Sequence, residues 1–325
     1  MEEIIVPQPA AEVPQTFEFK GKGSELFGIQ LPNWVLTIIT LGLYYPWAKA
    51  EKLKYLYQKT EFAGSRFKFH GTGKEMFKGL LKAHAVFAIL YGVLMVCVLN
   101  ESETIRISGI AFFYVALLSL IPLAIYGQMR YRLSRTSWRG IHFAFTASLK
   151  EMYTTYLKGI FFTIITLGLY AAWFAVDLRK LIVGNIRIGN VKLQFDGEGG
   201  DLFIIHLKGR ILTMLTLGIY FFWYMCELHQ YYINNVLIEQ DGKYSRLEAN
   251  VTGSGFFKLL AGNILIIVFT LGLGTPFVTA RTMRYVINNC ELFCNLDLEN
   301  LEQAQPDNID ATMEDFADIL NLDLA

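Results

Sequence analysis

The sequence predicts a polytopic α-helical membrane protein with internal repeats and short β-hairpins between its helices. Hydrophobic residues make up 53% of the 325-residue chain and charged residues only 18%. Together with a positive mean hydropathy, this composition is typical of a chain that lies mainly in a bilayer. The repeats are predicted by a five-residue phrase and a strand-like motif, which return along the chain together.

The phrase is Thr-Leu-Gly-Leu-Tyr at Thr40, and it returns at Thr166 and, with isoleucine, at Thr216. A fourth copy at Thr270 lacks the tyrosine. Each copy closes an apolar run, and an aromatic residue follows seven positions after each threonine: Trp47, Trp173, Trp223 and Phe277. Such self-similarity is typical of a repeated structural unit that is longer than the phrase itself.

The strand-like motif alternates apolar and polar residues and ends in glycines. It begins as FEFKGKG at Phe17 and returns at Phe67, Phe143 and Leu193, with a weaker copy at Leu247. Turn-forming glycines precede the later copies, which predicts short β-hairpins. Each unit is thus expected to contain a hairpin, a glycine break, an apolar helix, the phrase as a turn and an amphipathic helix.

These patterns divide the chain into seven segments. They are a disordered arm (1–16), repeat unit 1 (17–79), a two-span transmembrane hairpin with a basic hairpin (80–140), repeat unit 2 (141–192), repeat unit 3 (193–246), repeat unit 4 (247–298) and an acidic tail (299–325). The tail holds eight of the 29 acidic residues and no Lys or Arg, so the remaining chain is basic. A basic body suits anionic lipid headgroups, and the tail could dock on this body or on a partner.

Two apolar stretches, 80–99 and 107–126, are each about twenty residues long, which suffices to cross about 30 Å of hydrocarbon. A short loop with Glu101 and Glu103 separates them. Four arginines follow the second stretch: Arg130, Arg132, Arg135 and Arg139. By the positive-inside rule, the arginines lie in the cytoplasm and the acidic loop lies outside.

The helices that carry the phrase are harder to orient. Their apolar runs are about fifteen to twenty residues long, near the lower limit for a span, and basic residues flank most of them on both sides. A single crossing would put one basic flank outside the cytoplasm. Alternatively, the phrase glycine ends one helix, and a proline such as Pro46 or Pro276 starts a second helix that returns to the same face. The sequence leaves both arrangements open.

One set of charges recurs at a fixed place in the repeat. Four residues after each phrase aromatic lies a charged residue: Glu51, Asp177, Glu227 and Arg281. If the units pack around a pseudo-symmetry axis, these charges converge at membrane depth, as sites do between the repeats of transporters. We predict a polar intramembrane site in which the carboxylates bind a cation or proton and Arg281 competes with it. The alternative is that these residues make headgroup contacts and surface pairs.

Other chemistry lacks a motif. The histidines and cysteines show no metal-ligand spacing, the glycine-rich segments near Gly71 and Gly197 lack the rest of a phosphate loop, and no nucleophile motif occurs. The sequence therefore predicts no catalytic residue, no cofactor, no metal site and no enzyme. The expected partners are the lipid bilayer, anionic lipid headgroups, and a second copy of the chain or a cytoplasmic protein, with no nucleic acid.

Three segments of the first unit carry a resemblance. They are "FxFxGxGxxLF" from Phe17, "TLGLYYPWAK" from Thr40, and the continuation from Tyr55 through Thr60 and Gly64 to Phe67-Lys68-Phe69-His70-Gly71. These segments resemble the YjgN-like family of bacterial inner-membrane proteins, a domain of unknown function, over residues 17–298. The resemblance implies a multi-pass protein of the bacterial inner membrane, with no established activity and no catalytic residue. The fourth phrase departs from the pattern at Gly274 and Phe277.

Two classes of function follow from these features. We predict an integral membrane protein that acts as a transporter or channel for a small solute or ion, because internal repeats with charges at membrane depth are typical of transporters. The alternative is a non-transporting membrane scaffold that recruits a partner through cytoplasmic hairpins or the acidic tail.

Overall fold

Within residues 14–293, the part of the chain that this computed structural model describes, ten short strands close into one antiparallel barrel. Strands that follow one another in the chain pair in the barrel, and β1 closes the ring by pairing with β10 as well as with β2. The strands are β1 (Gln15–Phe19), β2 (Thr60–Phe62), β3 (Ser65–Phe69), β4 (Thr136–Trp138), β5 (Ile141–Phe145), β6 (Ile186–Ile188), β7 (Val191–Phe195), β8 (Val236–Gln240), β9 (Lys243–Ala249) and β10 (Cys290–Phe293).

Two helices follow each odd-numbered strand, so the order strand, helix, helix, strand occurs five times in the described residues. The pairs are α1 (Gly23–Ile39) with α2 (Tyr45–Gln58), α3 (Gly73–Val98) with α4 (Glu103–Ser134), α5 (Leu149–Ile165) with α6 (Ala171–Gly184), α7 (Gly199–Leu215) with α8 (Phe221–Asn234), and α9 (Gly253–Phe269) with α10 (Thr275–Asn288). Each pair is a helical hairpin. We call α3–α4, with helices of 26 and 32 residues, the long hairpin. The other four are the short hairpins, each with helices of 17 and 14 residues.

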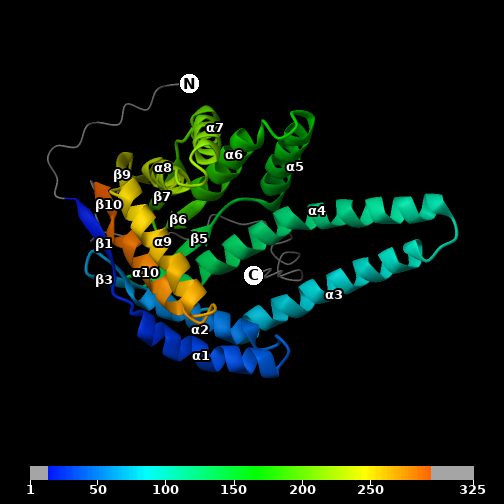
Figure 1. Ribbon diagram of the computed structural model, residues 1–325, viewed down its shortest axis with the longest axis horizontal. Coiled ribbons are helices and arrows are strands. Elements are labelled where there is room, and N and C mark those ends of the chain that lie inside the picture. Colours follow the sequence, from blue (N-terminus) through cyan, green and yellow to red (C-terminus); the bar gives the residue numbers. More distant parts are fainter. Residues whose placement is uncertain (1–13, 294–325) are drawn as a thin grey trace.

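All of these helical hairpins leave the same rim of the barrel. Because neighbouring strands run in opposite directions, the end of each odd-numbered strand and the start of the next even-numbered strand lie at one rim. The opposite rim carries tight turns such as Ala63-Gly64 and Asp241-Gly242, whose residues have positive φ angles, as in type I′ turns. Figure 1 shows the barrel at the left and the long hairpin reaching farthest from it.

The predicted fold class, a polytopic α-helical membrane protein with short β-hairpins between its helices, is wrong. The β-hairpins are sides of one closed barrel, and among the described residues only α3 and α4 are long and apolar enough to cross a membrane. Pairing across a tight turn leaves a local sequence pattern. Pairing across a helical hairpin does not, because it joins residues as far apart in the chain as Phe69 and Thr136. Barrel closure was therefore not visible in the sequence.

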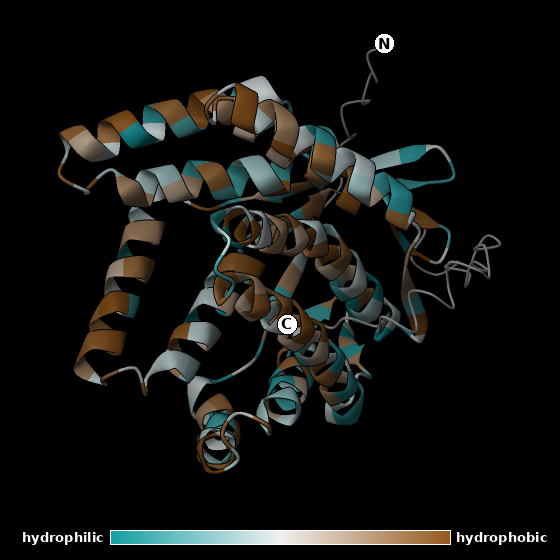
Figure 2. Ribbon diagram, turned by 90° about the vertical axis from the view of Figure 1, so that its right-hand side faces the viewer, coloured by the Kyte–Doolittle hydropathy of each residue, from teal (hydrophilic) through white to brown (hydrophobic). Residues whose placement is uncertain are grey.

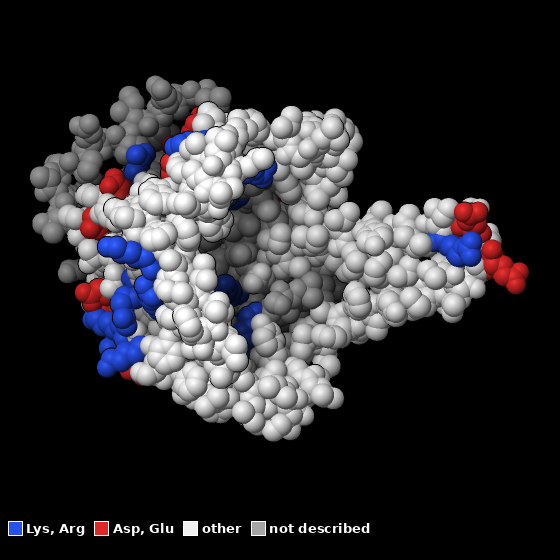
Figure 3. Space-filling view, in the orientation of Figure 1, with Lys and Arg blue, Asp and Glu red and all other residues white. Residues whose placement is uncertain are grey.

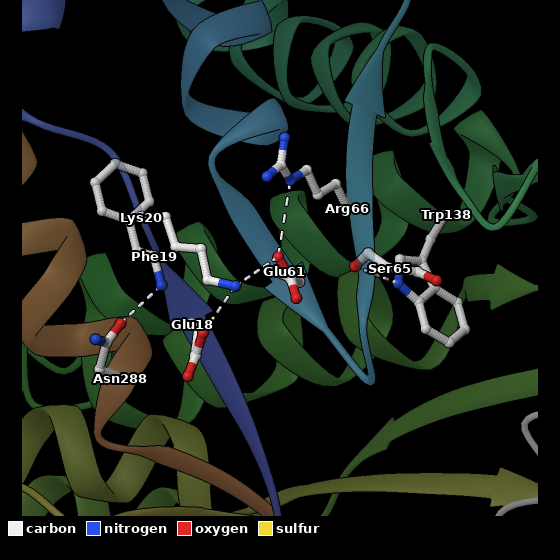
Figure 4. Close-up of polar contacts among 8 residues, drawn as sticks. All are labelled: Glu18, Phe19, Lys20, Glu61, Ser65, Arg66, Trp138 and Asn288. Atoms are coloured by element: carbon white, nitrogen blue, oxygen red, sulfur yellow. Dashed lines mark hydrogen bonds and ion pairs between the residues drawn. The ribbon is translucent and has the colours of Figure 1, made fainter.

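The barrel separates an apolar interior from a charged exterior, because alternate residues of a strand point to opposite faces. Phe62 is buried inside with Trp138 and Leu292, and Phe17 stacks on its ring at a centroid distance of 4.3 Å. Outside, Lys20 Nζ lies 2.9 Å from Glu61 Oε2 (Figure 4). We call the pairing of β1 with β2 the barrel seam. Helix α10 also supports it, since Asn288 Oδ1 accepts a hydrogen bond from the Phe19 N–H at 2.7 Å.

A glycine and an aromatic residue form each of four junctions between neighbouring helical hairpins. Gly73, at the start of α3, packs so closely on α2 that an added Cβ atom would lie 2.7 Å from Trp47 Cα. The corresponding contacts are Gly199 with Trp173, Gly253 with Trp223 and, across the closure of the ring, Gly23 with Phe277. Leu123 and Leu149 take these positions at the junction of α4 and α5. This packing explains why the strand motif ends in glycine and why an aromatic residue follows each phrase.

Two predicted segments fall largely outside the described residues. The disordered arm is described only at residues 14–16, and the acidic tail, 299–325, lies beyond the last described residue.

Candidate functional site

The phrase forms the tip of each short hairpin, where the chain turns from the first helix to the second. In the first tip, the Leu41 and Gly42 N–H groups donate to carbonyls in the last turn of α1 at 3.1 and 2.7 Å, as in a Schellman motif. Thr40 Oγ1 accepts from the Tyr44 N–H at 3.0 Å. Equivalent bonds recur at Thr166, Thr216 and Thr270. Every backbone N–H from Thr40 to Tyr45 thus has an acceptor, as hydrocarbon surroundings require.

A fully exposed leucine stands at each of these tips. Leu41, Leu167, Leu217 and Leu271 are 93, 94, 96 and 93% exposed, with φ angles from 49° to 51°. The left-handed conformation costs a residue other than glycine about 1–2 kcal/mol, and an exposed leucine gains nothing from water in return. Burial of a leucine side chain in an apolar phase is worth about 1.5–3 kcal/mol. The tips therefore suit apolar surroundings.

Charged residues are kept away from the outer parts of the helical hairpins. In Figure 3, Lys, Arg, Asp and Glu gather over the barrel and at the far tip of the long hairpin, and the surface between is nearly free of charge. Figure 2, which views the molecule from the right-hand side of Figure 1, shows hydrophobic stretches along the helices, interrupted by polar residues. Glu101 and Glu103 lie at the tip of the long hairpin. On this face, the molecule has an apolar band between two polar ends.

The four charges that the sequence singles out lie at the same position of four second helices, and each contacts its own hairpin. The contacts are Glu51 with Asn33, Asp177 with Tyr170, Glu227 with Lys208 and Arg281 with the carbonyl of Lys258, at 2.7, 3.2, 2.7 and 2.9 Å. Within residues 14–293, no hydrogen bond or ion pair joins any two of the four. The structure therefore places these charges in four separate hairpins and does not bring them together.

A cavity of about 470 Å³ lies where the second helices meet the strands, and we call it the central cavity. Side chains from α2, α4, α8 and α10 line it together with side chains from β1, β2, β3, β9 and β10. Most of them are aliphatic or aromatic, such as Leu53, Phe67 and Met283, and none is Asp or Glu. The cavity is thus an apolar space to which four of the five helical hairpins contribute.

Two nitrogen-bearing side chains face this apolar space. Arg132 of α4 and His229 of α8 line the cavity, and Arg132 Nε and His229 Nε2 are buried without a hydrogen-bond partner among the described residues. Arg179 of α6 also has a buried, unpartnered Nε, and its guanidinium lies 4.9 Å from the ring centroid of Tyr232. A buried polar atom without a partner costs about 1–3 kcal/mol. Each such atom marks a place where a water molecule or a ligand atom would find a hydrogen-bond partner.

The surroundings of the cavity disfavour charge on titratable groups. Burial lowers the pKa of His229, so its imidazole is neutral at pH 7. Burial, with a smaller contribution from Glu291, raises the pKa of Cys290 to about 11. Burial also lowers the pKa of Arg179, but a guanidinium stays protonated in proteins. The cavity therefore combines a lining of low polarity with a permanent positive charge on Arg132.

The cavity lining contains one thiol and no carboxylate. Within residues 14–293, no three His, Cys, Asp or Glu side chains lie close enough together to hold a metal ion. No carboxylate lines the cavity, and its one thiol, Cys290, has a raised pKa and is therefore a poor nucleophile. What the cavity offers is an apolar surface with a cationic edge.

Sequence reasoning missed Arg179 and His229, and it used Arg132 only to orient a predicted span. The signal that could have found them is positional. Aligning the second helices at the strand that follows each one puts Arg179 and His229 in register with Leu53 and Met283. A polar residue at a position that is aliphatic in the other units breaks the pattern of a packed face, which is where functional sites are expected.

The chain matches one protein family and is similar to two inner-membrane proteins. The family described as "Bacterial protein of unknown function (DUF898)" matches residues 14–194, 190–244 and 224–319. Inner membrane protein YjgN of Escherichia coli O157:H7 is 36% identical over 143 residues, 44% of this chain and 34% of that protein. Inner membrane protein YjgN of Salmonella typhimurium (strain LT2) is 26% identical over 172 residues, 53% of this chain and 41% of that protein. No solved structure matches the chain.

These matches confirm the predicted YjgN-like resemblance, although the matched part spans less than half the length of either relative. The names of the relatives support a location in the inner membrane. Because the family match extends over all five strand-helix-helix-strand units of the described residues, the chain belongs to the DUF898 family of bacterial proteins of unknown function.

Proposed function

We propose that the protein inserts into the inner membrane from the cytoplasmic side and takes up a small amphipathic molecule from the inner leaflet into the central cavity. The observation that carries this proposal is the place of the cavity. All helical hairpins of the described residues leave one rim of the barrel, and the second helices of four of them, α2, α4, α8 and α10, line the cavity. A molecule dissolved in the leaflet would reach the cavity by passing between hairpins, without crossing water.

Helix lengths support two depths of insertion. The exposed apolar side chains of α3 extend from Leu81 to Leu99, about 27 Å at 1.5 Å per residue and close to the thickness of the hydrocarbon core. Those of the short hairpins extend over 10 to 14 residues, from Leu31 to Leu41 in the first and from Phe257 to Leu271 in the last, about 15–21 Å, or half to two thirds of that thickness. We infer that the long hairpin crosses the bilayer twice and that the short hairpins enter one leaflet and return.

The distribution of charge supports the orientation. Arg130, Arg132 and Arg135 lie at the barrel end of α4, whereas Glu101 and Glu103 lie at the opposite end of the long hairpin. The positive-inside rule then puts the barrel in the cytoplasm and the acidic tip outside. Re-entry also accounts for basic residues on both sides of the short apolar runs, since both flanks face the cytoplasm.

This arrangement favours the handling of a small molecule over an ion channel or a scaffold. Only two helices of the described residues are long enough to cross the bilayer, and two helices alone do not enclose a polar path. The four charges expected to bind an ion lie in separate hairpins. A scaffold, for its part, has no need of an apolar cavity lined from four helical hairpins.

The test compares two substitutions of methionine by tryptophan. Met283→Trp adds a large side chain to the lining of the central cavity, whereas Met214→Trp adds it at a position that is 81% exposed, at the end of α7. Binding of tritiated hexadecanol to the full-length protein in detergent is expected to fall about tenfold or more in Met283→Trp, because the cavity is filled. It is expected to stay unchanged in Met214→Trp. Equal binding by the two variants would contradict the proposal.

A further inference from the structure

The two sides of the central cavity differ in chemistry. The wall formed by α2 and α10 carries Leu53, Leu56, Met283 and Ile287. The lining from α4 and α8 includes Arg132 and His229. An occupant that satisfies both sides needs a hydrocarbon part and a polar part joined in one molecule.

The polar part has to be negatively charged. Arg132 carries a permanent charge, and no described carboxylate forms an ion pair with it or with Arg179. Arg132 Nε and His229 Nε2 are buried without a partner among residues 14–293. The cavity lining contains no Asp or Glu that would repel an anion. A ligand carboxylate or phosphate would supply the missing acceptor oxygens, and it matches the planar donor array of a guanidinium.

The hydrocarbon part is limited by volume. The cavity of about 470 Å³ lies within the range of small-molecule sites, roughly 300–1,000 Å³. It suits one hydrocarbon chain better than two. The access between membrane-embedded hairpins that the proposed function describes makes the inner leaflet the source of such a molecule.

We propose that the central cavity binds a single-chain acidic lipid from the inner leaflet, with its chain against α2 and α10 and its carboxylate or phosphate at Arg132 and His229. This inference rests on the proposed function and adds to it the charge and the chain number of the ligand. Arg179 stands on α6, the second helix of the hairpin between those of α4 and α8, and its guanidinium lies 4.9 Å from the ring centroid of Tyr232.

The experiment compares an acid with an alcohol of the same chain length. Full-length protein in detergent is titrated with tritiated palmitate and with tritiated hexadecanol. Palmitate is expected to bind about tenfold more tightly than hexadecanol. Arg132→Gln is expected to remove this preference by weakening palmitate alone, and Arg132→Lys to restore part of it, since the charge returns without the planar fork. Arg66→Gln, on the outer face of the barrel, is the matched control and is expected to change neither affinity.

The outcomes separate this inference from the proposed function. If palmitate and hexadecanol bind equally and Met283→Trp weakens both, the cavity takes up amphiphiles but the acidic-lipid inference is overturned. If neither probe binds to wild-type protein that unfolds cooperatively on heating, both proposals fail. Should Arg132→Gln not fold, His229→Gln provides the second test, because loss of its imidazole is expected to weaken palmitate about threefold and to spare hexadecanol. Equal loss of both ligands in that variant would count against a role in anion binding.

Discussion

The long hairpin and the short hairpins begin alike and end differently. At the base, a tyrosine of the second helix bonds the first turn of the first helix. Tyr131 Oη donates to Glu75 at 3.1 Å in the long hairpin, as Tyr55 Oη does to Glu25 at 3.0 Å in the first short hairpin. At the tips, the long hairpin has the polar sequence 100–104, whereas the short hairpins have the apolar phrase. Tip polarity therefore changes together with hairpin length.

A bilayer gives this difference a physical reason. A polar tip that ended at mid-bilayer would leave its polar groups without water, at several kcal/mol each. An apolar tip beyond the far headgroups would expose leucine to water without any gain. A side chain also stabilises the turn at the polar tip, since the Ser102 N–H donates to Asn100 Oδ1 at 3.0 Å. Hairpins with the same contacts at the barrel can thus reach two depths in the bilayer when helix length and tip sequence change together.

Chemical labelling is expected to show the largest difference between the long and the short hairpins. In a full-length chain whose native cysteines are replaced, single cysteines are placed at Asn100, Leu41 and Lys243, the last on the turn-bearing rim of the barrel. With a maleimide that cannot cross the inner membrane, we expect labelling of Asn100→Cys in intact cells and of Lys243→Cys only after lysis. Leu41→Cys is expected to resist the reagent in both conditions, because hydrocarbon does not support thiolate formation.

Two results of this labelling would contradict the two-depth arrangement. Labelling of Leu41→Cys in intact cells would mean that the short hairpins cross the bilayer. Labelling of Lys243→Cys in intact cells would mean that the barrel lies outside the cytoplasm.

The junctions beside the long hairpin give the next largest effect. In Gly73→Ala, the new Cβ atom would lie 2.7 Å from Trp47 Cα, so the backbone must move apart. Overpacking of this kind costs about 1–3 kcal/mol. We expect a lower melting temperature in detergent. Gly200→Ala is the control, because a Cβ atom there meets nothing within 4 Å and alanine favours a helix. An unchanged melting temperature in Gly73→Ala would show that this junction is loose.

The sequence predicted the local parts of the fold and not its closure. The glycine turns and the phrase are signals of neighbouring residues, and Thr40, Leu41 and Gly42 form the helix-ending turn that the phrase indicates. The barrel depends on pairs such as Gln15 with Leu292, which no local pattern records. The long hairpin was predicted as two conventional spans because its apolar length hides the base that it shares with the short hairpins.

The lining of the central cavity could not be predicted from the sequence, for a related reason. Glu51 and Glu227 stand out in the sequence as charges beside apolar runs, yet they bond their own hairpins. His229 and Arg132 look ordinary in the sequence because the inward face of a helix is known only once the ring of units is closed. The charges that stand out in the sequence therefore mark contacts between the two helices of one hairpin. The residues that line the cavity come together only when the barrel closes.

A smaller effect is expected when one exposed tip leucine is replaced, because only one side chain loses its apolar surroundings. A fluorescent label at Leu43→Cys reports the depth of the first short tip through quenching by lipids with nitroxide groups at mid-chain. Leu41→Asn keeps a residue that tolerates the left-handed conformation but gives up about 1.5–3 kcal/mol of burial. We expect weaker quenching and a shallower tip. Leu99→Asn, at the far end of the long hairpin, is the matched control and is expected to leave this quenching unchanged.

The smallest effect is expected at the barrel seam below both kinds of hairpin. The hydrogen bond from Lys20 lowers the pKa of Glu61, and the hydrogen bonds to Glu61 and then Glu18 raise the pKa of Lys20. A lowered carboxyl pKa gives stability that is present above the unfolded-state pKa and is lost as the pH falls through the folded-state pKa. A raised lysine pKa gives stability that is lost as the pH rises through its folded value. The seam is therefore strongest near neutral pH.

Glu61→Gln tests this sign. We expect its melting temperature to lie slightly below that of the wild type at pH 7, by a few degrees at most because the Lys20 side chain is about half exposed and water screens the pair. The gap should close as the pH falls through the lowered folded-state pKa of Glu61, below which the wild-type carboxyl is protonated as well. Glu239→Gln, on β8, removes a carboxylate elsewhere on the barrel and is the control. A gap of the same size at a pH below that lowered pKa would mean that the Glu61 side chain supports the seam by packing, and that the closure of the barrel does not depend on its charge.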